Sequence, residues 1–180
     1  MDNFVNKLHT LDVEVKDEAL LNKYLHEKSV YRYNLILDQL LKAKRKICDN
    51  HLHDFYKYDL RVRRLLFKYL TPYEIKLRAK VLNENSQCQD YIENLDFGRL
   101  IKEFYNNDED HKKVKKLRNY VFHHRMLQLC PMIEIIEGIN SMLKKLDKSK
   151  FISELNNLSE NLLLIYRFKV KDDIVEYDLE

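Results

Sequence analysis

The stretch FYKYDLRVRRLLFKYLTPYEIKLRAKV, from Phe55 to Val81, decides the fold class because its apolar side chains recur with the period of a helix. The positions that share one face are Val62, Leu65, Leu66 and Tyr69. The tetrapeptide TPYE has the form of a helix start, with Thr71 as N-cap, Pro72 in the first turn and Glu74 closing a capping box. The stretch therefore predicts two successive amphipathic helices, the second running to about Asn85.

The composition agrees with a helical class. The 180 residues include 2 glycines and 2 prolines, whereas ordinary usage is about 7% and 5%. Few positions can therefore supply the positive φ angles that hairpin-rich β folds need. We expect an all-α fold in a single domain over residues 1–180. Its core should span about residues 29–168, followed by an acidic C-terminal tail at 169–180.

Further helices are predicted outside this stretch. Helical periodicity covers about Asp17–Lys28, Val30–Tyr58, Lys112–Leu129, Met132–Leu146 and Ser149–Phe168. A less regular helix at Cys88–Tyr105 is expected to be interrupted or loosened at Gly98, and the polar segment 106–113 is expected to be an exposed connection. Leu11–Val15 alternates between apolar and polar residues and can be extended, and the acidic tail is expected to form a peripheral strand or to fray.

Charge and cysteine content bear on the cellular setting. The net charge of +3 is mildly basic and says little about partners. Cys48, Cys88 and Cys130 lie far apart without a C-x-x-C pair, which favours free thiols of a reducing compartment over a disulfide framework or a zinc site. The N-terminus lacks the pattern of a signal peptide. The most apolar window, NLLLIYRF, is much shorter than the ~20 residues of a membrane span. We therefore expect a soluble, cytoplasmic protein that does not enter the membrane.

The stretch KKLRNYVFHHRMLQLC, residues 115–130, carries the candidate chemistry. Residues five apart on a helix are separated by roughly 140° around its axis, so Arg118 and His123 do not share a face. Asn119 and His123, four apart, do share one. Two rows result: a polar row of Lys112, Lys116, Asn119 and His123, and an apolar row of Val114, Leu117, Val121 and His124. This division predicts a core position for His124 and a functional position for His123.

Geometry alone favours a solvated helix face for this basic stretch, and other polar motifs also have structural explanations. HLHD at residues 51–54 is similar to a metal-ligand string, but His51 and His53 are two apart and point away from each other on a helix. Glu74 and Arg78 are four apart and predict a structural salt bridge. The basic runs at 42–46 and 61–64 are either solvated helix faces or additional RNA-binding surface.

Two blocks of this sequence resemble a known superfamily. The segment LRNYVFHHRML resembles the R-N-x-x-x-H signature of the HEPN superfamily, compact helical domains that typically dimerise and include RNA-cleaving toxins. Its double histidine is most similar to that of the Abi-like abortive-infection proteins. The second block is the stretch Phe55–Val81, in which the residues that match the Abi-like pattern are Asp59, Arg63, Glu74, Ile75, Leu77 and Arg78. Together the two blocks place the resemblance at roughly residues 50–130.

The resemblance implies a HEPN-like helical bundle that acts as a homodimeric, metal-independent endoribonuclease. It also implies a role as a phage-defence toxin, restrained by an RNA or protein antitoxin. RNA carries its own nucleophile, the 2′-hydroxyl, so cleavage needs proton transfer and positive charge at the phosphate rather than a metal or cofactor. We therefore assign His123 as general acid/base, Arg118 as the phosphate-binding group and Asn119 as an orienting residue.

Further residues are assigned to substrate contact on the same segment. They are His124, Arg125, Lys112, Lys115 and Lys116, whose positive or polar groups suit an RNA backbone. Some of the 12 tyrosines could serve as base-stacking platforms, although most fit core or rim positions. The second hypothesis is a catalytically inactive HEPN-fold module that binds RNA or a protein. A helical DNA-binding regulator ranks last, because the sequence shows no helix-turn-helix with a glycine-containing turn.

Overall fold

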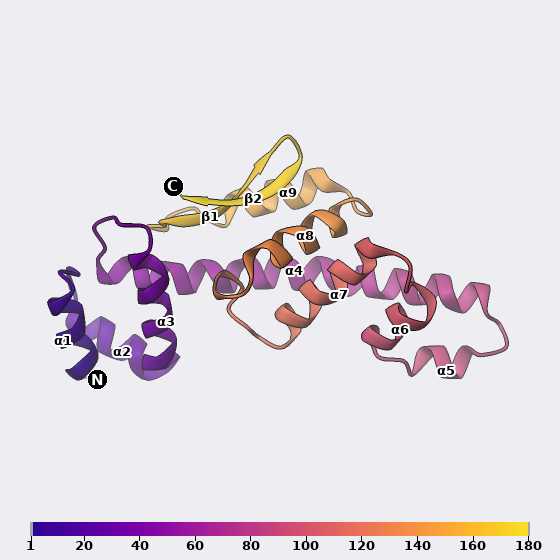
Figure 1. Ribbon diagram of the computed structural model, residues 1–180, viewed down its shortest axis with the longest axis horizontal. Helices are drawn as coiled ribbons and strands as arrows, with labels where there is room; N and C mark the ends of the chain where they lie inside the picture. The colour runs from indigo at the N-terminus through magenta and orange to yellow at the C-terminus, as the bar shows by residue number, and fades with distance from the viewer. Residues whose placement is uncertain (1, 180) are drawn as a thin grey trace.

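The computed structural model describes residues 2–179, which form a mostly helical molecule with a C-terminal β-hairpin (Figure 1). The elements in chain order are α1 (Asp2–Thr10), α2 (Glu18–Lys28), α3 (Val30–Leu41), α4 (Asp49–Glu84), α5 (Gln89–Glu93), α6 (Phe97–Phe104), α7 (Glu109–Phe122), the 3-10 turn η1 (Leu127–Leu129), α8 (Met132–Leu143), α9 (Lys148–Asn157), β1 (Tyr166–Lys171) and β2 (Ile174–Leu179). Met1 and Glu180, the two ends of the expected domain, lie outside the described residues.

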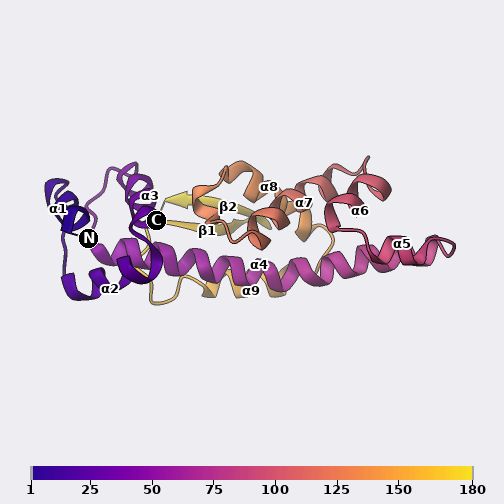
Figure 2. The same cartoon turned by 90° about the horizontal axis from the view of Figure 1, so that it is seen from below.

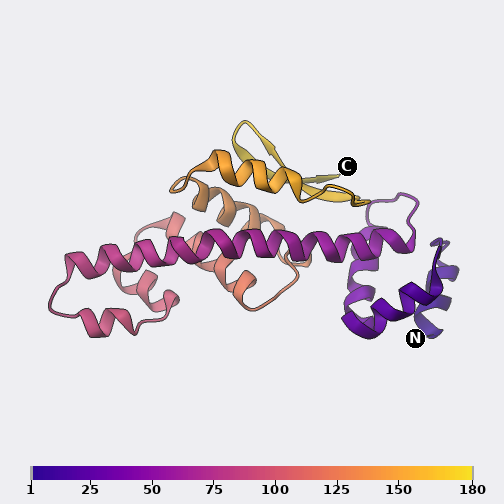
Figure 3. The same cartoon turned by 180° about the vertical axis from the view of Figure 1, so that it is seen from behind.

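The 36-residue helix α4 forms the long axis of the molecule (Figures 1 and 3). It runs through Pro72, so the helix boundary expected at TPYE is wrong. Thr71 does not cap a new helix, because its hydroxyl donates to the carbonyl oxygen of Phe67 at 3.0 Å. Leu70 and Tyr73 are buried on either side of the proline. The free energy gained by burying these two side chains outweighs the loss of the backbone hydrogen bond that proline, which has no N–H, cannot donate.

The helix expected over Val30–Tyr58 is two helices, α3 and α4. The intervening chain turns at Lys44, which has a φ of 53°. Cys48 then forms an isolated parallel bridge with Glu14. The extended backbone expected for Leu11–Val15 is therefore confirmed at Glu14. The break lets α1, α2 and α3 fold back together against the first turns of α4 (Figure 1).

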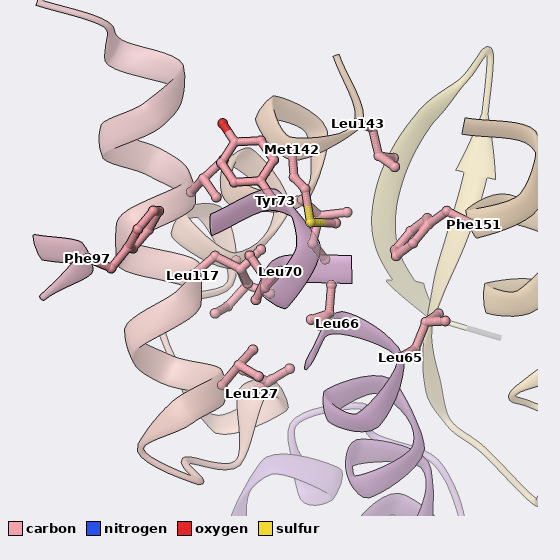
Figure 4. Close-up of a cluster of buried hydrophobic side chains, with 14 of the residues drawn as sticks. Leu65, Leu66, Leu70, Tyr73, Phe97, Leu117, Leu127, Met142, Leu143 and Phe151 are labelled. Atoms are coloured by element: carbon pink, nitrogen blue, oxygen red, sulfur yellow. The ribbon is translucent and has the colours of Figure 1, made fainter. Parts of the chain in front are cut away.

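Buried side chains form two clusters along α4. The larger lies where α4, α7 and α8 meet and includes Leu66, Leu117 and Met142 (Figure 4). Figure 2 shows α7 and α8 on one side of α4 and α9 on the other. Gly138 of α8 permits the close approach of α7, because a Cβ there would lie only 2.6 Å from the Cβ of Leu117. The second cluster joins α1, α2 and α3 to the start of α4.

The chain after α9 forms an antiparallel hairpin instead of continuing the helix expected over Ser149–Phe168. Asp172 and Asp173 form its two-residue turn with φ angles of 50° and 63°, the conformation that type I′ hairpins require. Phe168 and Val175 are buried against the larger cluster, which fixes the register of the strands. The mostly helical class is confirmed for the described chain, and the peripheral strand expected in the acidic tail is confirmed at β2. The expectation of a purely α fold is wrong, because β1 replaces the end of the helix expected up to Phe168.

The middle of the chain also differs in detail from the prediction. The break between α5 and α6 lies before Asp96, whose carboxylate caps α6 by accepting from the backbone N–H of Arg99. The expected interruption of this helix is therefore present, but its expected position is wrong, because Gly98 lies within α6. The exposed connection expected at 106–113 ends before α7 begins at Glu109. Within residues 2–179, no helix is long and apolar enough to cross a bilayer.

Candidate functional site

The candidate site is built where α7 ends. This helix stops at Phe122, not near Leu129 as expected, and the next three residues form a Schellman turn. The backbone N–H of His124 donates to the carbonyl of Val121, and that of Arg125 donates to the carbonyl of Tyr120. The turn leaves His123 at the C-cap and His124 in the left-handed region with a φ of 53°.

The turn separates the two histidines from the core. His124 is exposed, so its expected place in the apolar row is wrong. The reason is that helical periodicity no longer applies beyond Phe122. The other members of that row, Val114, Leu117 and Val121, are buried as expected.

His123 is exposed and lines an open hollow of about 390 Å³ at the junction of α7 and α8. The hollow is also lined by Lys116, Asn119, Tyr120, Arg125 and Glu134. Asn119 and His123 therefore share one surface, as their four-residue spacing predicts. Arg125 adds positive charge here, with its guanidinium 5.6 Å from the centre of the Tyr120 ring.

Glu134 is the carboxylate of this hollow and is already partnered. Its two carboxylate oxygens accept from the Tyr120 hydroxyl at 2.9 Å and from the Lys116 ammonium at 3.3 Å. The hydrogen bond from Tyr120, followed by that from Lys116, holds the pKa of Glu134 below its ordinary value. Sequence reasoning missed both Tyr120 and Glu134. Glu134 lies beyond Pro131 on α8, and only the packing of α8 on α7 brings it to this surface.

Arg118 lies away from this hollow. Its Nε donates to a carboxylate oxygen of Glu74 on α4 at 3.4 Å, and its guanidinium covers the Phe122 ring at 4.2 Å. Glu74 also pairs with Arg78 at 3.4 Å, so the structural salt bridge expected between these two residues is confirmed. A single chain therefore does not bring Arg118 to His123, in agreement with the 140° between them on a helix.

The remaining predicted contact residues are spread along α7. Lys112 pairs with Glu109 one turn earlier at 2.7 Å, Lys115 is half-buried, and Lys116 is the lysine that lines the hollow. Of the assigned residues, the structure gathers Lys116, Asn119, His123 and Arg125 at one hollow. It leaves Lys112, Lys115 and Arg118 outside that group, and His124 lines a neighbouring hollow instead.

Part of the basic run at 61–64 has a structural role. Arg63 is buried and donates to Asp59 at 2.9 Å, and Arg61 donates to the carbonyl oxygens of Leu158 and Glu160. Arg63 forms an ion pair within α4, and Arg61 links α4 to the chain that follows α9. They are therefore not free to form an RNA-binding surface.

The histidines of the HLHD motif also have structural contacts. The Nδ1 of His51 accepts from the backbone N–H of Cys48 at 3.0 Å, and the ring of His53 stacks on Tyr24 at 3.8 Å. Among residues 2–179, no group of three or more His, Cys, Asp or Glu side chains is arranged to hold a metal ion. Cys48, Cys88 and Cys130 are free thiols, as expected.

Comparisons of this chain with protein-family models, with curated proteins and with solved structures find no match.

Proposed function

We propose that this chain is a metal-independent endoribonuclease of the HEPN type that cleaves RNA as a symmetric dimer and acts as a phage-defence toxin. The observation that carries the proposal is the grouping of His123, Asn119, Lys116 and Arg125 at one exposed hollow. A proton-transferring imidazole lies there beside an amide and two cations, the groups that cleavage of a phosphodiester by its own 2′-hydroxyl requires.

The reaction forms a bond from the 2′-oxygen to phosphorus while the bond from phosphorus to the 5′-oxygen breaks. The imidazole of His123 takes the proton of the 2′-hydroxyl and water gives a proton to the departing 5′-oxygen, while the arginine that binds the phosphate comes from the other protomer. The products are a 2′,3′-cyclic phosphate and a 5′-hydroxyl. Arginine suits the developing negative charge of the transition state because its planar fork presents several donors to phosphate oxygens.

The placement of Arg118 supports a dimer in this proposal. Its guanidinium pairs with Glu74 of α4, roughly 140° around the axis of α7 from His123, so a two-fold partner is needed to bring Arg118 to each histidine. An exposed apolar face lies beside it: Phe67 and Ile75 of α4 are 48% and 61% exposed, and Phe67 stacks on Phe122. Burying such a face against a second copy would remove apolar area from water.

The second candidate is an inactive module of the same fold that binds RNA without cutting it. The ion pair between Arg118 and Glu74 favours this candidate, because a paired arginine is less available to a phosphate. The two candidates differ in one outcome, the cleavage of bound RNA.

The test compares purified wild-type protein with the His123→Ala and Arg118→Ala variants on RNA in the presence of a metal chelator. We expect wild-type protein to produce 2′,3′-cyclic phosphate and 5′-hydroxyl ends, and each variant to be slower by about 10²–10⁴-fold. Sequencing of RNA ends after brief induction in cells should show the same dependence, with growth arrest for the wild type alone.

The matched control is His124→Asn. Asparagine tolerates the left-handed conformation of this residue and removes the neighbouring imidazole. We expect this variant to lose far less activity than His123→Ala. Equal cleavage by wild type, His123→Ala and Arg118→Ala would reject the proposed site, and RNA binding without any cleavage would support the second candidate.

A further inference from the structure

Three neighbouring hollows that share lining residues, together called the groove here, extend from the His123 hollow along α3. A second hollow shares Tyr120, His123 and Arg125 with the first and reaches Tyr31, Arg32 and Leu35 of α3. A third shares Leu35, Leu129, Cys130 and Pro131 with the second and ends at the β-hairpin. The helix α3 contacts η1, and Figure 2 shows the end of β2 pointing toward α3.

One face of α3 lines this groove with exposed side chains. Tyr31, Leu35 and Asp38 recur at helical spacing along it, Arg32 lies beside Tyr31, and Lys42 follows at the C-cap. Tyr31 is 70% exposed, which is unusual for an aromatic ring because contact with water forgoes the free energy of burial. The ring is therefore free to stack on a partner, in a hollow that it shares with His123 and Arg125.

The charge of the groove suits an anionic strand. Its cations include Arg32, Lys42 and Arg125. The acidic residues along it already pair with lysines: Asp38 with Lys7 at 3.7 Å, Glu134 with Lys116 at 3.3 Å and Asp178 with Lys169 at 3.9 Å. The balance of charge along the groove is therefore positive.

We propose that this groove binds one strand of single-stranded RNA, with the Tyr31 ring stacking on a base next to the phosphate at His123 and Arg32 contacting the backbone. The inference rests on the proposed function and adds to it the form of the substrate and the residues that hold it. Exposed aromatic rings beside arginines are how proteins hold unpaired bases. The bases of a duplex are stacked on one another and cannot reach such a ring.

The test measures binding of the full chain to fluorescent 12-nucleotide RNA in which every 2′-hydroxyl is methylated, so that it cannot be cut. We expect Tyr31→Ala to weaken binding of the single strand about tenfold, and Tyr31→Phe to bind within about twofold of wild type, because the ring is kept. A duplex of the same sequence should bind more weakly and without dependence on Tyr31.

Tyr91→Ala is the matched control, because Tyr91 is a 51%-exposed tyrosine on α5 that does not line the groove. It should bind as wild type does. Single-strand binding that is unchanged in Tyr31→Ala, or lost equally in Tyr91→Ala, overturns the inference, as does the absence of any binding. Cleavage of unmodified RNA is measured in parallel. If the protein cleaves RNA but its binding does not depend on Tyr31, the groove proposal is rejected and the nuclease proposal stands. If binding depends on Tyr31 but no RNA is cleaved, the groove proposal is supported and the nuclease proposal is rejected.

Discussion

Asp59 is the residue that ties the longest helix to the turn beside the candidate site. Its side chain is fully buried and accepts from the Arg63 guanidinium at 2.9 Å and from the backbone N–H of Gln128 at 3.1 Å. Burial raises the pKa of Asp59 to about 6, although both hydrogen bonds oppose this shift. The carboxylate is therefore ionised at neutral pH and becomes protonated in mildly acidic solution.

Asp59→Asn should destabilise the fold, because it leaves the buried guanidinium of Arg63 without a counter-charge. We expect the free energy of unfolding, measured in urea at pH 7, to fall by about 3 kcal/mol. The folded pKa lies above the unfolded value near 3.9, so the folded wild type binds more protons between pH 4 and 6. The deficit of the variant should therefore grow as the pH falls from 7 to 5.

The control is Glu84→Gln, which removes an exposed pair with Lys80 near the end of α4. It should change stability little at any of these pH values. A deficit of Asp59→Asn that stays constant, or shrinks, as the pH falls would contradict a raised pKa for Asp59.

The sequence was sufficient to predict the position of His123 but not that of His124. The spacing of Asn119 and His123 was sufficient to place both on one surface. The position of His124 could not be predicted, because it depends on where α7 ends. Helices usually end with glycine in the left-handed position, and here a histidine takes that conformation, so the sequence carries no visible stop signal.

At the scale of elements, the contact between α7 and α8 sets the position of the hollow. Gly138→Ala should disturb this contact, because the new Cβ would lie 2.6 Å from the Cβ of Leu117 and 3.1 Å from the carbonyl oxygen of Lys113. We expect a loss of about 1–3 kcal/mol in the free energy of unfolding. The RNA cleavage that we propose at His123 should slow as well, since α8 carries Glu134 into the hollow.

Gly98→Ala is the matched comparison, because the added Cβ would meet only a side-chain oxygen of Asp96. It should cost less stability than Gly138→Ala and leave activity unchanged. Equal stability of Gly138→Ala and the wild type in urea or thermal unfolding would show that α7 and α8 do not pack this closely.

Other element boundaries were predicted wrongly because contacts between elements outweigh the local sequence signals. TPYE is a good helix start in isolation, yet burial of Leu70 and Tyr73 keeps α4 continuous through Pro72. A strand in the tail was expected, but its pairing with β1 could not be predicted, because the turn uses two aspartates in place of glycine or asparagine. The helix α2 followed from periodicity, and its N-cap Asp17 accepts from the backbone N–H of Leu20. The helix α8 followed from its apolar face alone, because no side chain caps it at Pro131.

At the scale of the whole molecule, α4 joins two buried clusters, and the candidate site lies on α7 between them. The mostly helical class could be predicted from composition and periodicity. The grouping of Tyr120 and Glu134 with His123 could not, because it depends on contacts between elements. The separation of Arg118 from His123 could be predicted from their five-residue spacing. Because one chain does not bring the two residues together, the proposed function depends on a dimer.

That claim is tested most directly by combining two inactive variants in one dimer. Arg118→Ala and His123→Ala chains are co-expressed with different tags, mixed dimers are isolated through both tags, and RNA cleavage is compared with that of each variant alone. If arginine and histidine act across a two-fold interface, the mixed dimer keeps one of each and should cleave at least about tenfold faster than either parent. A mixed dimer as inactive as its parents, or a wild-type chain that cleaves RNA as a monomer, would contradict the account.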